Sequence, residues 1–304
     1  MGTKTSSGTL FKSELVLDLF NKVKGRSTLA KLCGGIPIAF SGIDVMTFSM
    51  DGEAAIVGEG AQKPAGEAAA GTVTIKPVKF VYQHRVSDEF LKMSEEKQLP
   101  IMQAFNDGFS KKIARGFDIA AFHGVNPATN TASTIVGTNC FDSAVATTIT
   151  FNSAAPDDNI DSAVAPIQTA EKDVTGIAMA PAFGSALGAM KMADSHAPMY
   201  PEFRYGANPG NFGGMPADIN STVSFGNSLD RAIVGDFANA FRWGYAQNVT
   251  FEVIPYGDPD GQGDLKRTNE IVLRSECYVG WGILDAASFT RIVAAAQADS
   301  TEGT

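Results

Sequence analysis

The sequence predicts an α+β fold, and three features of its apolar pattern carry that prediction. Apolar residues alternate with polar ones from Thr72 to Ser87, as in a strand with one buried face. Leu99 to Phe122 repeats bulky apolar residues every four positions, as in a long helix. A helix–strand–helix pattern lies between Ile160 and Met190. Strands and helices are therefore segregated along the chain, which is typical of α+β proteins.

A protruding hairpin is expected in the first third of the chain. Met46, Phe48 and Met50 alternate with polar residues as a strand, and the glycine- and alanine-rich stretch 53–71 follows as a loop. At ~3.3 Å per residue, the returning segment 72–87 would extend about 50 Å, with a bend at Pro77. That is long for a compact domain. We therefore expect the tip, residues 58–66, to reach over a neighbouring molecule.

The N-terminal segment predicts an amphipathic arm. Ser13 can cap a helix in which Val16, Leu19, Phe20 and Val23 follow helical spacing. The arm precedes any compact domain, so its apolar face must be covered by later sequence or by another subunit.

The predicted long helix at 99–122 has an apolar stripe that drifts around it, because four-residue steps exceed the 3.6-residue turn. The helix should therefore contact several elements. Gly108 and Gly116 weaken it by up to ~1 kcal/mol each, which close packing would explain. The stripe consists of Ile101, Phe105, Phe109, Ile113, Phe117 and Ala121.

The remainder divides into three parts. Residues 126–153 are rich in Thr, Asn, Ala and Ser and predict a connection. The helix–strand–helix region follows, with an irregular loop at 198–214. Strands return at 249–253 and 271–283, joined by an aspartate- and glycine-rich turn at 258–264.

Composition limits the possible partners and compartment. The 304 residues carry 24 Lys+Arg against 33 Asp+Glu, a net charge of −9, which disfavours tight binding to DNA or to an anionic membrane. The three cysteines form no CxxC pair, so neither a disulfide framework nor a zinc site is indicated. No signal peptide or membrane span is visible, which predicts a soluble protein made in the cytoplasm.

The sequence contains no recognisable catalytic motif. Ser41 and Ser185 lack the G-x-S-x-G context of a nucleophile elbow, and Gly58-Glu59-Gly60 lacks the third glycine of a dinucleotide fingerprint. We therefore expect no catalytic residue and no cofactor.

Metal ligands are likewise not predicted. His84, His123 and His196 are isolated in the sequence, and packing or surface roles are favoured over metal ligation. Asp258, Asp260 and Asp264 resemble the start of a calcium loop, but the later carboxylates are missing, so a solvated turn is favoured.

The order of elements, with short motifs along it, resembles the Hong Kong 97-type major capsid protein of tailed bacteriophages. Each motif is weak alone, and the match depends on their order over nearly the whole chain. The motifs are Ala55–Gly60, Val78–Phe80, Val86–Leu91, Asp118–Gly124, Ile177–Pro181, Gly214–Pro216, Ile233–Phe237 and Asp285–Phe289.

This resemblance implies a domain organisation. Residues 1–36 would be the N-terminal arm and 45–80 the extended loop. A peripheral domain would comprise 81–147, with its spine helix at 99–122, and, after an axial domain at 148–242, also 243–293. Residues 294–304 would be a C-terminal tail.

The implied function is structural: a major head protein, not an enzyme, that self-assembles as hexamers and pentamers into the icosahedral virion capsid around the phage genome. Assembly would occur in the host bacterial cytoplasm. A cleavable scaffolding segment of the kind some relatives carry is not seen here, so either a separate scaffold protein exists or the sequence is a matured or engineered form. The leading Met1 favours the separate scaffold protein. A portal, a decoration protein and non-specifically contacted double-stranded DNA are the further expected partners, with no membrane. The alternatives are an encapsulin-like nanocompartment shell and, more remotely, a soluble hydrolase.

The resemblance also implies intersubunit contacts at both extensions. We assign Val16, Leu19 and Phe20 of the arm, and Glu59 and Lys63 of the loop tip, to such contacts. One member of the resembled family joins a loop lysine to a neighbour's asparagine by an isopeptide bond. Lys63 occupies the loop tip here, but no matching motif surrounds Asn269, Glu270 or Glu276, so cross-linking is not favoured.

Overall fold

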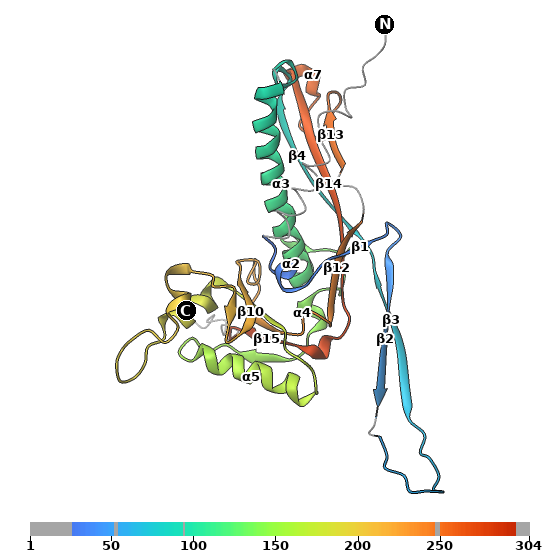
Figure 1. Ribbon diagram of the computed structural model, residues 1–304. Helices are drawn as coiled ribbons and strands as arrows, with labels where there is room; N and C mark the ends of the chain where they lie inside the picture. The colour runs from blue at the N-terminus through green and yellow to red at the C-terminus, as the bar shows by residue number, and fades with distance from the viewer. Residues whose placement is uncertain (1–25, 52–53, 94, 247–249, 296–304) are drawn as a thin grey trace, which may run out of the picture.

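A computed structural model describes residues 26–51, 54–93, 95–246 and 250–295 of the chain. In these residues, helices and strands form an upper unit, a lower unit and a hairpin that projects away from both (Figure 1). The predicted α+β class is confirmed.

The upper unit is a mixed sheet covered by one long helix (Figure 1). Its central strand, β14 (Glu270–Ile283), pairs antiparallel with β4 (Val78–Ser87) on one side. On its other side, β14 pairs antiparallel with β13 (Thr250–Ile254) through residues 272–276 and with β12 (Phe241–Ala246) through residues 279–283. β1 (Ile36–Ile38) then pairs with β12 in parallel. The helix is α3 (Glu95–His123), so the predicted helix at 99–122 lies within it.

The predicted stripe explains where α3 lies. Phe109, Ile113 and Phe117 are buried, and the Phe117 ring lies against both Trp243 of β12 and Trp281 of β14. Gly116 meets the close-packing expectation, since a Cβ there would lie 3.3 Å from the Phe80 ring. Gly108 does not, because a Cβ there would meet no atom within 4 Å.

The hairpin consists of β2 (Ile43–Asp51) and β3 (Glu67–Ile75), paired in register from Ile43↔Ile75 to Asp51↔Glu67. Figure 1 shows it leaving the sheet and extending away from both units. The returning strand starts at Glu67, five residues before the predicted Thr72, and it is interrupted at Lys76 and Pro77 before β4. Proline lacks the N–H that a continuous ladder needs.

The lower unit is a sheet in the order β7-β15-β11-β8-β10-β9 with α5 (Pro156–Thr169) and α6 (Pro181–Ala189) on one face. The apolar pattern predicted both helices and the buried strand β8. The strands are β7 (Thr148–Thr150), β15 (Phe289–Val293), β11 (Asp230–Gly235), β8 (Gly176–Met179), β10 (Met215–Ile219) and β9 (Asn211–Phe212).

The last strand differs from the predicted division of the chain. Residues 243–293 were assigned as a whole to the peripheral domain, but β15 pairs with β11 and β7 in the lower sheet. After β14 the chain turns through η4 (Ala286–Ser288) and crosses to the other unit. The apolar pattern of a short strand does not state which sheet receives it.

Short elements complete the chain. Residues 26–36, the described part of the predicted arm, are folded onto the body through α2 (Thr28–Leu32) and β1. In the parts of the chain that are described, no helix is long and apolar enough to cross a membrane. The remaining elements are η2 (Asp88–Lys92), β5 (Val125–Asn126), β6 (Thr131–Ala132), α4 (Phe141–Ala144), η3 (Pro201–Gly206) and α7 (Leu265–Thr268).

Candidate functional site

The base of the hairpin is fixed to the sheet by apolar packing over two glycines of β14. Ile75 is fully buried and clusters with Ile38 and Ala246. A Cβ at Gly280 would lie 2.7 Å from Ile38 Cδ1, and one at Gly282 would lie 3.0 Å from Ile75 Cγ1. Only a strand without side chains at these positions lets the hairpin pack this closely, so the base is rigidly placed.

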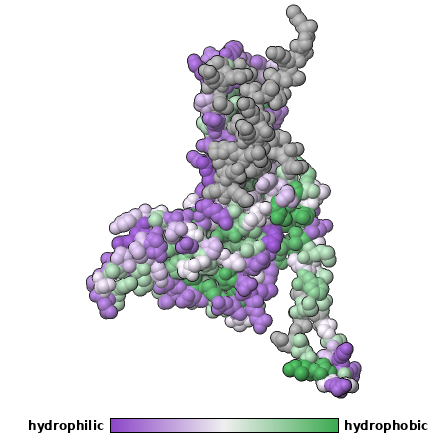
Figure 2. Space-filling view, in the orientation of Figure 1, coloured by the Kyte–Doolittle hydropathy of each residue, from purple (hydrophilic) through white to green (hydrophobic). Residues whose placement is uncertain are grey.

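Beyond its base, the hairpin presents an apolar face that nothing in the described chain covers. Met46, Phe48 and Met50 lie opposite Thr72, Ala70 and Ala68, and residues directly opposite in an antiparallel pair share a face. The three large side chains are 77%, 65% and 76% exposed. Figure 2 shows hydrophobic residues along the hairpin at lower right. Such a surface on a projecting ribbon indicates a binding partner.

Of the predicted contact residues, the structure describes only the two at the hairpin tip. Glu59 and Lys63 lie exposed in the loop between β2 and β3, as predicted, where Gly60 adopts a left-handed φ of 80°. Their contacts with another subunit stay a prediction. Val16, Leu19 and Phe20 lie outside the described residues.

The described part of the predicted arm is anchored by two buried carboxylates. Asp118 of α3 accepts hydrogen bonds from the Ser27 hydroxyl at 2.5 Å and the Thr28 N–H at 2.9 Å. Asp218 of β10 accepts from the Thr28 hydroxyl and from Lys31 Nζ, each at 2.5 Å. α2 is therefore joined to both units at once.

Burial dominates the electrostatics of Asp118. The residue is fully buried, which raises its pKa to about 7, against the opposing effect of the Ser27 and backbone donors. Asp218 contributes a smaller increase through like-charge repulsion.

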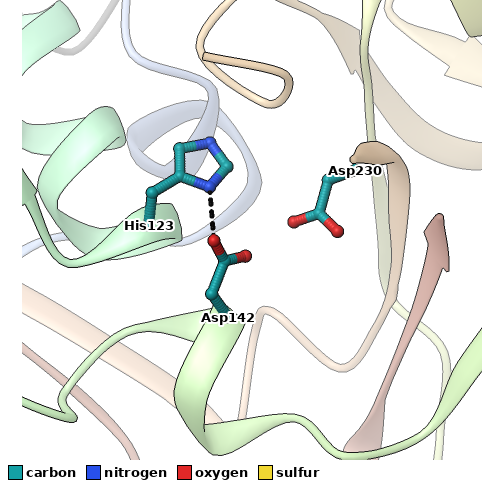
Figure 3. Close-up of side chains that lie close together, drawn as sticks. All are labelled: His123, Asp142 and Asp230. Atoms are coloured by element: carbon teal, nitrogen blue, oxygen red, sulfur yellow. Dashed lines mark hydrogen bonds and ion pairs between the residues drawn. The ribbon is translucent and has the colours of Figure 1, made fainter. Parts of the chain in front are cut away.

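A second buried cluster lies where the two units meet (Figure 3). His123 Nδ1, at the end of α3, lies 2.9 Å from Asp142 Oδ2 of α4. Asp230 of β11 faces both, and Arg291 of β15 lies 2.8 Å from Asp142 Oδ1 and 2.9 Å from Asp230 Oδ1. A packing or surface role was expected for His123, and no sequence pattern indicates these neighbours.

His123, Asp142 and Asp230 place ligand-type atoms within 4.8 Å of one another, so a metal ion must be considered. The arrangement argues against one. Arg291 already supplies a fixed positive charge to both carboxylates, and both nitrogens of His123 are engaged, Nε2 with the Thr222 carbonyl at 2.8 Å. We therefore interpret the cluster as an ion-pair network.

The aspartate-rich turn is also occupied by a guanidinium. Asp260 binds Arg85 of β4 through two hydrogen bonds, of 2.8 and 2.5 Å, and Asp264 caps α7 by accepting from the Lys266 N–H. Arg85 is the main reason that the pKa of Asp260 falls to about 2. The turn is thus pinned to β4, where the sequence predicted a solvated turn.

The family of the chain follows from comparison with known proteins. The model of the phage capsid family matches residues 8–294, nearly the whole sequence. This chain belongs to the phage capsid family. No curated protein matches its sequence.

Solved structures agree with this assignment. A chain from Mycobacterium phage Ogopogo is 30% identical to this capsid protein, with a TM-score of 0.75 over 89% of this chain and 92% of that one. A chain from Gordonia phage Cozz is 24% identical, with a TM-score of 0.74 over 90% and 87%. A structure titled as the capsid of an empty GTA particle is 16% identical, with a TM-score of 0.60 over 89% and 90%. The last two support the fold alone.

These matches confirm the predicted family, fold and structural function. The protein is a major capsid protein, located in the virion capsid, that assembles with copies of itself, and its family is not one of enzymes. The matches give no support to the nanocompartment or hydrolase alternatives.

Proposed function

We propose that this capsid protein forms hexamers and pentamers around its lower unit and that its two extensions tie these capsomers into an icosahedral head. In this proposal the upper unit is the peripheral domain, with α3 as its spine helix. Residues 148–242 and β15 form the axial domain. The observation that carries the proposal is the exposed apolar face of Met46, Phe48 and Met50.

Energetics support a role for this face in contacts between subunits. Burying a Met or Phe side chain contributes about 1.5–3 kcal/mol. One hairpin therefore gives a modest contact, but the same contact is repeated over every subunit of a closed shell. Glu59 and Lys63 at the tip, and Val16, Leu19 and Phe20 of the arm, are proposed to contact the neighbour as well.

The remaining partners complete the proposal. The net charge of −9 suits a container whose wall does not bind the packaged double-stranded DNA tightly. A separate scaffold protein, a portal and a decoration protein are proposed to act during assembly in the host cytoplasm. Expression of this chain with and without neighbouring phage genes tests which of them it needs.

Electron microscopy and light scattering of the purified protein test the central proposal. We expect closed particles of many megadaltons. Finding only monomers in every condition, with scaffold included, would reject it.

A hairpin variant tests the role of the apolar face separately. Phe48→Ser with Met50→Ser should leave the subunit folded but prevent stable shells. The matched control is Ile135→Ser, because Ile135 is 78% exposed on the loop before α4. Normal shells from the double variant would reject the role of the hairpin and leave self-assembly itself intact.

A further inference from the structure

The buried charge cluster joins the two units of the subunit. His123 ends α3, which packs on the upper sheet, and Asp142 lies on α4, whose Phe141 packs against Phe241 of β12 and Phe289 of β15. Asp230 and Arg291 come from adjacent strands of the lower sheet. Asp230 is fully buried, and the His123 side chain is 3% exposed. Ion pairs and hydrogen bonds shielded in this way are screened little by salt.

The hydrogen bonds of His123 require a particular protonation state. Nε2 faces the Thr222 backbone carbonyl, which only accepts, so Nε2 must carry a proton. Nδ1 faces the Asp142 carboxylate at 2.9 Å, and an ionised carboxylate also only accepts. Both contacts are hydrogen bonds only when the imidazole carries two protons and is positively charged.

The neighbours of His123 support the charged form. Burial alone would lower its pKa, but the hydrogen bond and charge of Asp142, helped by the Thr222 carbonyl and by Asp230, raise the pKa above 6.5. Burial and the adjacent Asp142 raise the pKa of Asp230, against Arg291. Burial would likewise raise the pKa of Asp142, but His123, Asp230 and Arg291 lower it.

The other charged groups near the cluster have separate partners. Arg231, the neighbour of Asp230, donates to the Asp230 backbone carbonyl. Asp118 lies behind Thr222, whose hydroxyl donates to it at 3.3 Å. Thr222 thus connects the cluster to the α2 anchor but places no further charge on His123.

We propose that His123, Asp142, Asp230 and Arg291 form a proton-dependent clasp that holds the upper and lower units of the subunit together. The clasp is closed while His123 carries both ring protons. Loss of the Nδ1 proton removes the hydrogen bond to Asp142 and leaves the partly exposed Asp142 and the fully buried Asp230 carboxylates facing Arg291 alone.

The sign of the pH effect follows from the shifts. Folding raises the pKa of His123 above 6.5. Its contribution to the stability of the folded subunit is therefore complete below pH 6.5 and is lost as the pH rises through the folded pKa. Asp230, also raised, loses its contribution over the range above 3.8 as the pH increases. Asp142 is lowered, so its contribution fails only at acid pH, below 3.8. The Asp230 part of the clasp should therefore weaken as the pH rises to about 7, and the His123 part as the pH rises further above 6.5.

Amide hydrogen exchange of the full chain tests this proposal. The rates are corrected for the intrinsic pH dependence of exchange, and all samples are kept in the same assembly state. Between pH 6 and pH 9, we expect a several-fold loss of protection in α4, β11 and β15. The core helix α5 is the internal reference and should change little. Because Asp118 anchors α2, a change of exchange in α2 would report the titration of Asp118 separately from that of the cluster.

Variants distinguish the clasp from general loosening. His123→Gln should give low protection at the junction at both pH values, and the control His196→Gln, on an exposed loop, should behave like the wild type. If His123→Gln does not fold, Asp142→Asn and the wild-type pH profile remain decisive. The proposal would be overturned if the wild-type protection of α4, β11 and β15 did not change with pH. It would also be overturned if His123→Gln or Asp142→Asn showed the same pH dependence as the wild type.

Discussion

Asn139 and Trp281 exchange two hydrogen bonds: the indole Nε1–H of Trp281 donates to the Asn139 backbone carbonyl at 2.9 Å, and Asn139 Nδ2 donates to the Trp281 carbonyl at 2.8 Å. This exchange fixes the loop before α4 to the central strand β14. It also orients the Trp281 ring, which is 1% exposed and lies against Phe117.

Asn139→Ala should therefore lower the free energy of unfolding by about 1 kcal/mol, because one hydrogen bond to the sheet is lost. Urea denaturation followed by tryptophan fluorescence measures the change. Thr138→Ala, one residue earlier on the same exposed loop, is the control and should have little effect. Equal urea midpoints for the two variants would show that the side chain of Asn139 does not contribute to the free energy of unfolding.

The Asp118 anchor predicts a pH-dependent stability. Its pKa is raised to about 7 by burial, so the folded state holds a proton that the unfolded state releases above pH 3.8. The Asp118 contribution should thus decrease as the pH rises from about 4 to 7. Asp118→Asn should remove this slope and should destabilise the protein by about 1–3 kcal/mol, because an amide NH₂ replaces an oxygen that accepts hydrogen bonds from α2 or Thr222.

Urea midpoints measured at several pH values between 4 and 8 test this prediction. The wild type minus the variant gives the Asp118 contribution directly. A difference that stays constant over this range would contradict the assigned pKa.

Alanine substitutions at two glycines should have opposite effects on the stability of the protein. Gly280→Ala places a methyl group 2.7 Å from Ile38 Cδ1 and 3.0 Å from the Lys76 carbonyl, and should cost about 1–3 kcal/mol through overpacking at the base of the hairpin. Gly108→Ala meets no atom within 4 Å on α3 and should stabilise the helix by up to ~1 kcal/mol. Thermal unfolding of the two variants beside the wild type measures both effects, and the same sign for both would contradict the packing argument.

The elements that the sequence predicted well are those whose pattern is local. Alternation across Met46, Phe48 and Met50 indicated the first strand of the hairpin, and the four-residue stripe indicated α3 to within a few residues at each end. These patterns depend only on which side of an element faces the core, so neighbours in the sequence carry the whole signal.

The parts that were missed depend on residues far apart in the chain. His123 appeared isolated, yet Asp142, Asp230 and Arg291 surround it from elements up to 168 positions away. Arg85 reaches Asp260 across 175 positions. A single sequence contains no pattern for such contacts, and for the same reason it did not show that β15 joins the lower sheet.

The cysteines should be chemically inert in the folded protein. Burial raises the pKa of the Cys33 thiol and raises that of Cys277 to about 12, and Cys140 is only 1% exposed. Because the thiolate is the reactive form, a maleimide at pH 7 should label the native chain only after urea is added. Lys63→Cys, on the exposed loop tip, is the positive control and should be labelled at once. Rapid labelling of the native wild type would show that the buried sites open.

Lys63 is predicted not to form a covalent cross-link in mature particles. An isopeptide bond would need a desolvated lysine, a nearby asparagine and a carboxyl group whose pKa is raised. Figure 1 places the hairpin tip and the α7 end of β14 at opposite extremes of the subunit, so Asn269 could be reached only in another copy. Asn269 is the C-cap of α7, with a left-handed φ of 53°.

The nearby carboxylates are unsuitable for assisting that reaction. The pKa of Glu270 is lowered by its hydrogen bonds from Thr268 and Arg85, and Glu276 forms an ion pair with Lys79 at 2.7 Å. Both carboxylates are thus already paired with cations, Glu270 with Arg85 and Glu276 with Lys79. Boiling purified particles in detergent should therefore release a single band at the mass of one chain. A ladder of covalent multimers that disappears in Lys63→Ala, but persists in the loop control Gln62→Ala, would show that the cross-link forms after all.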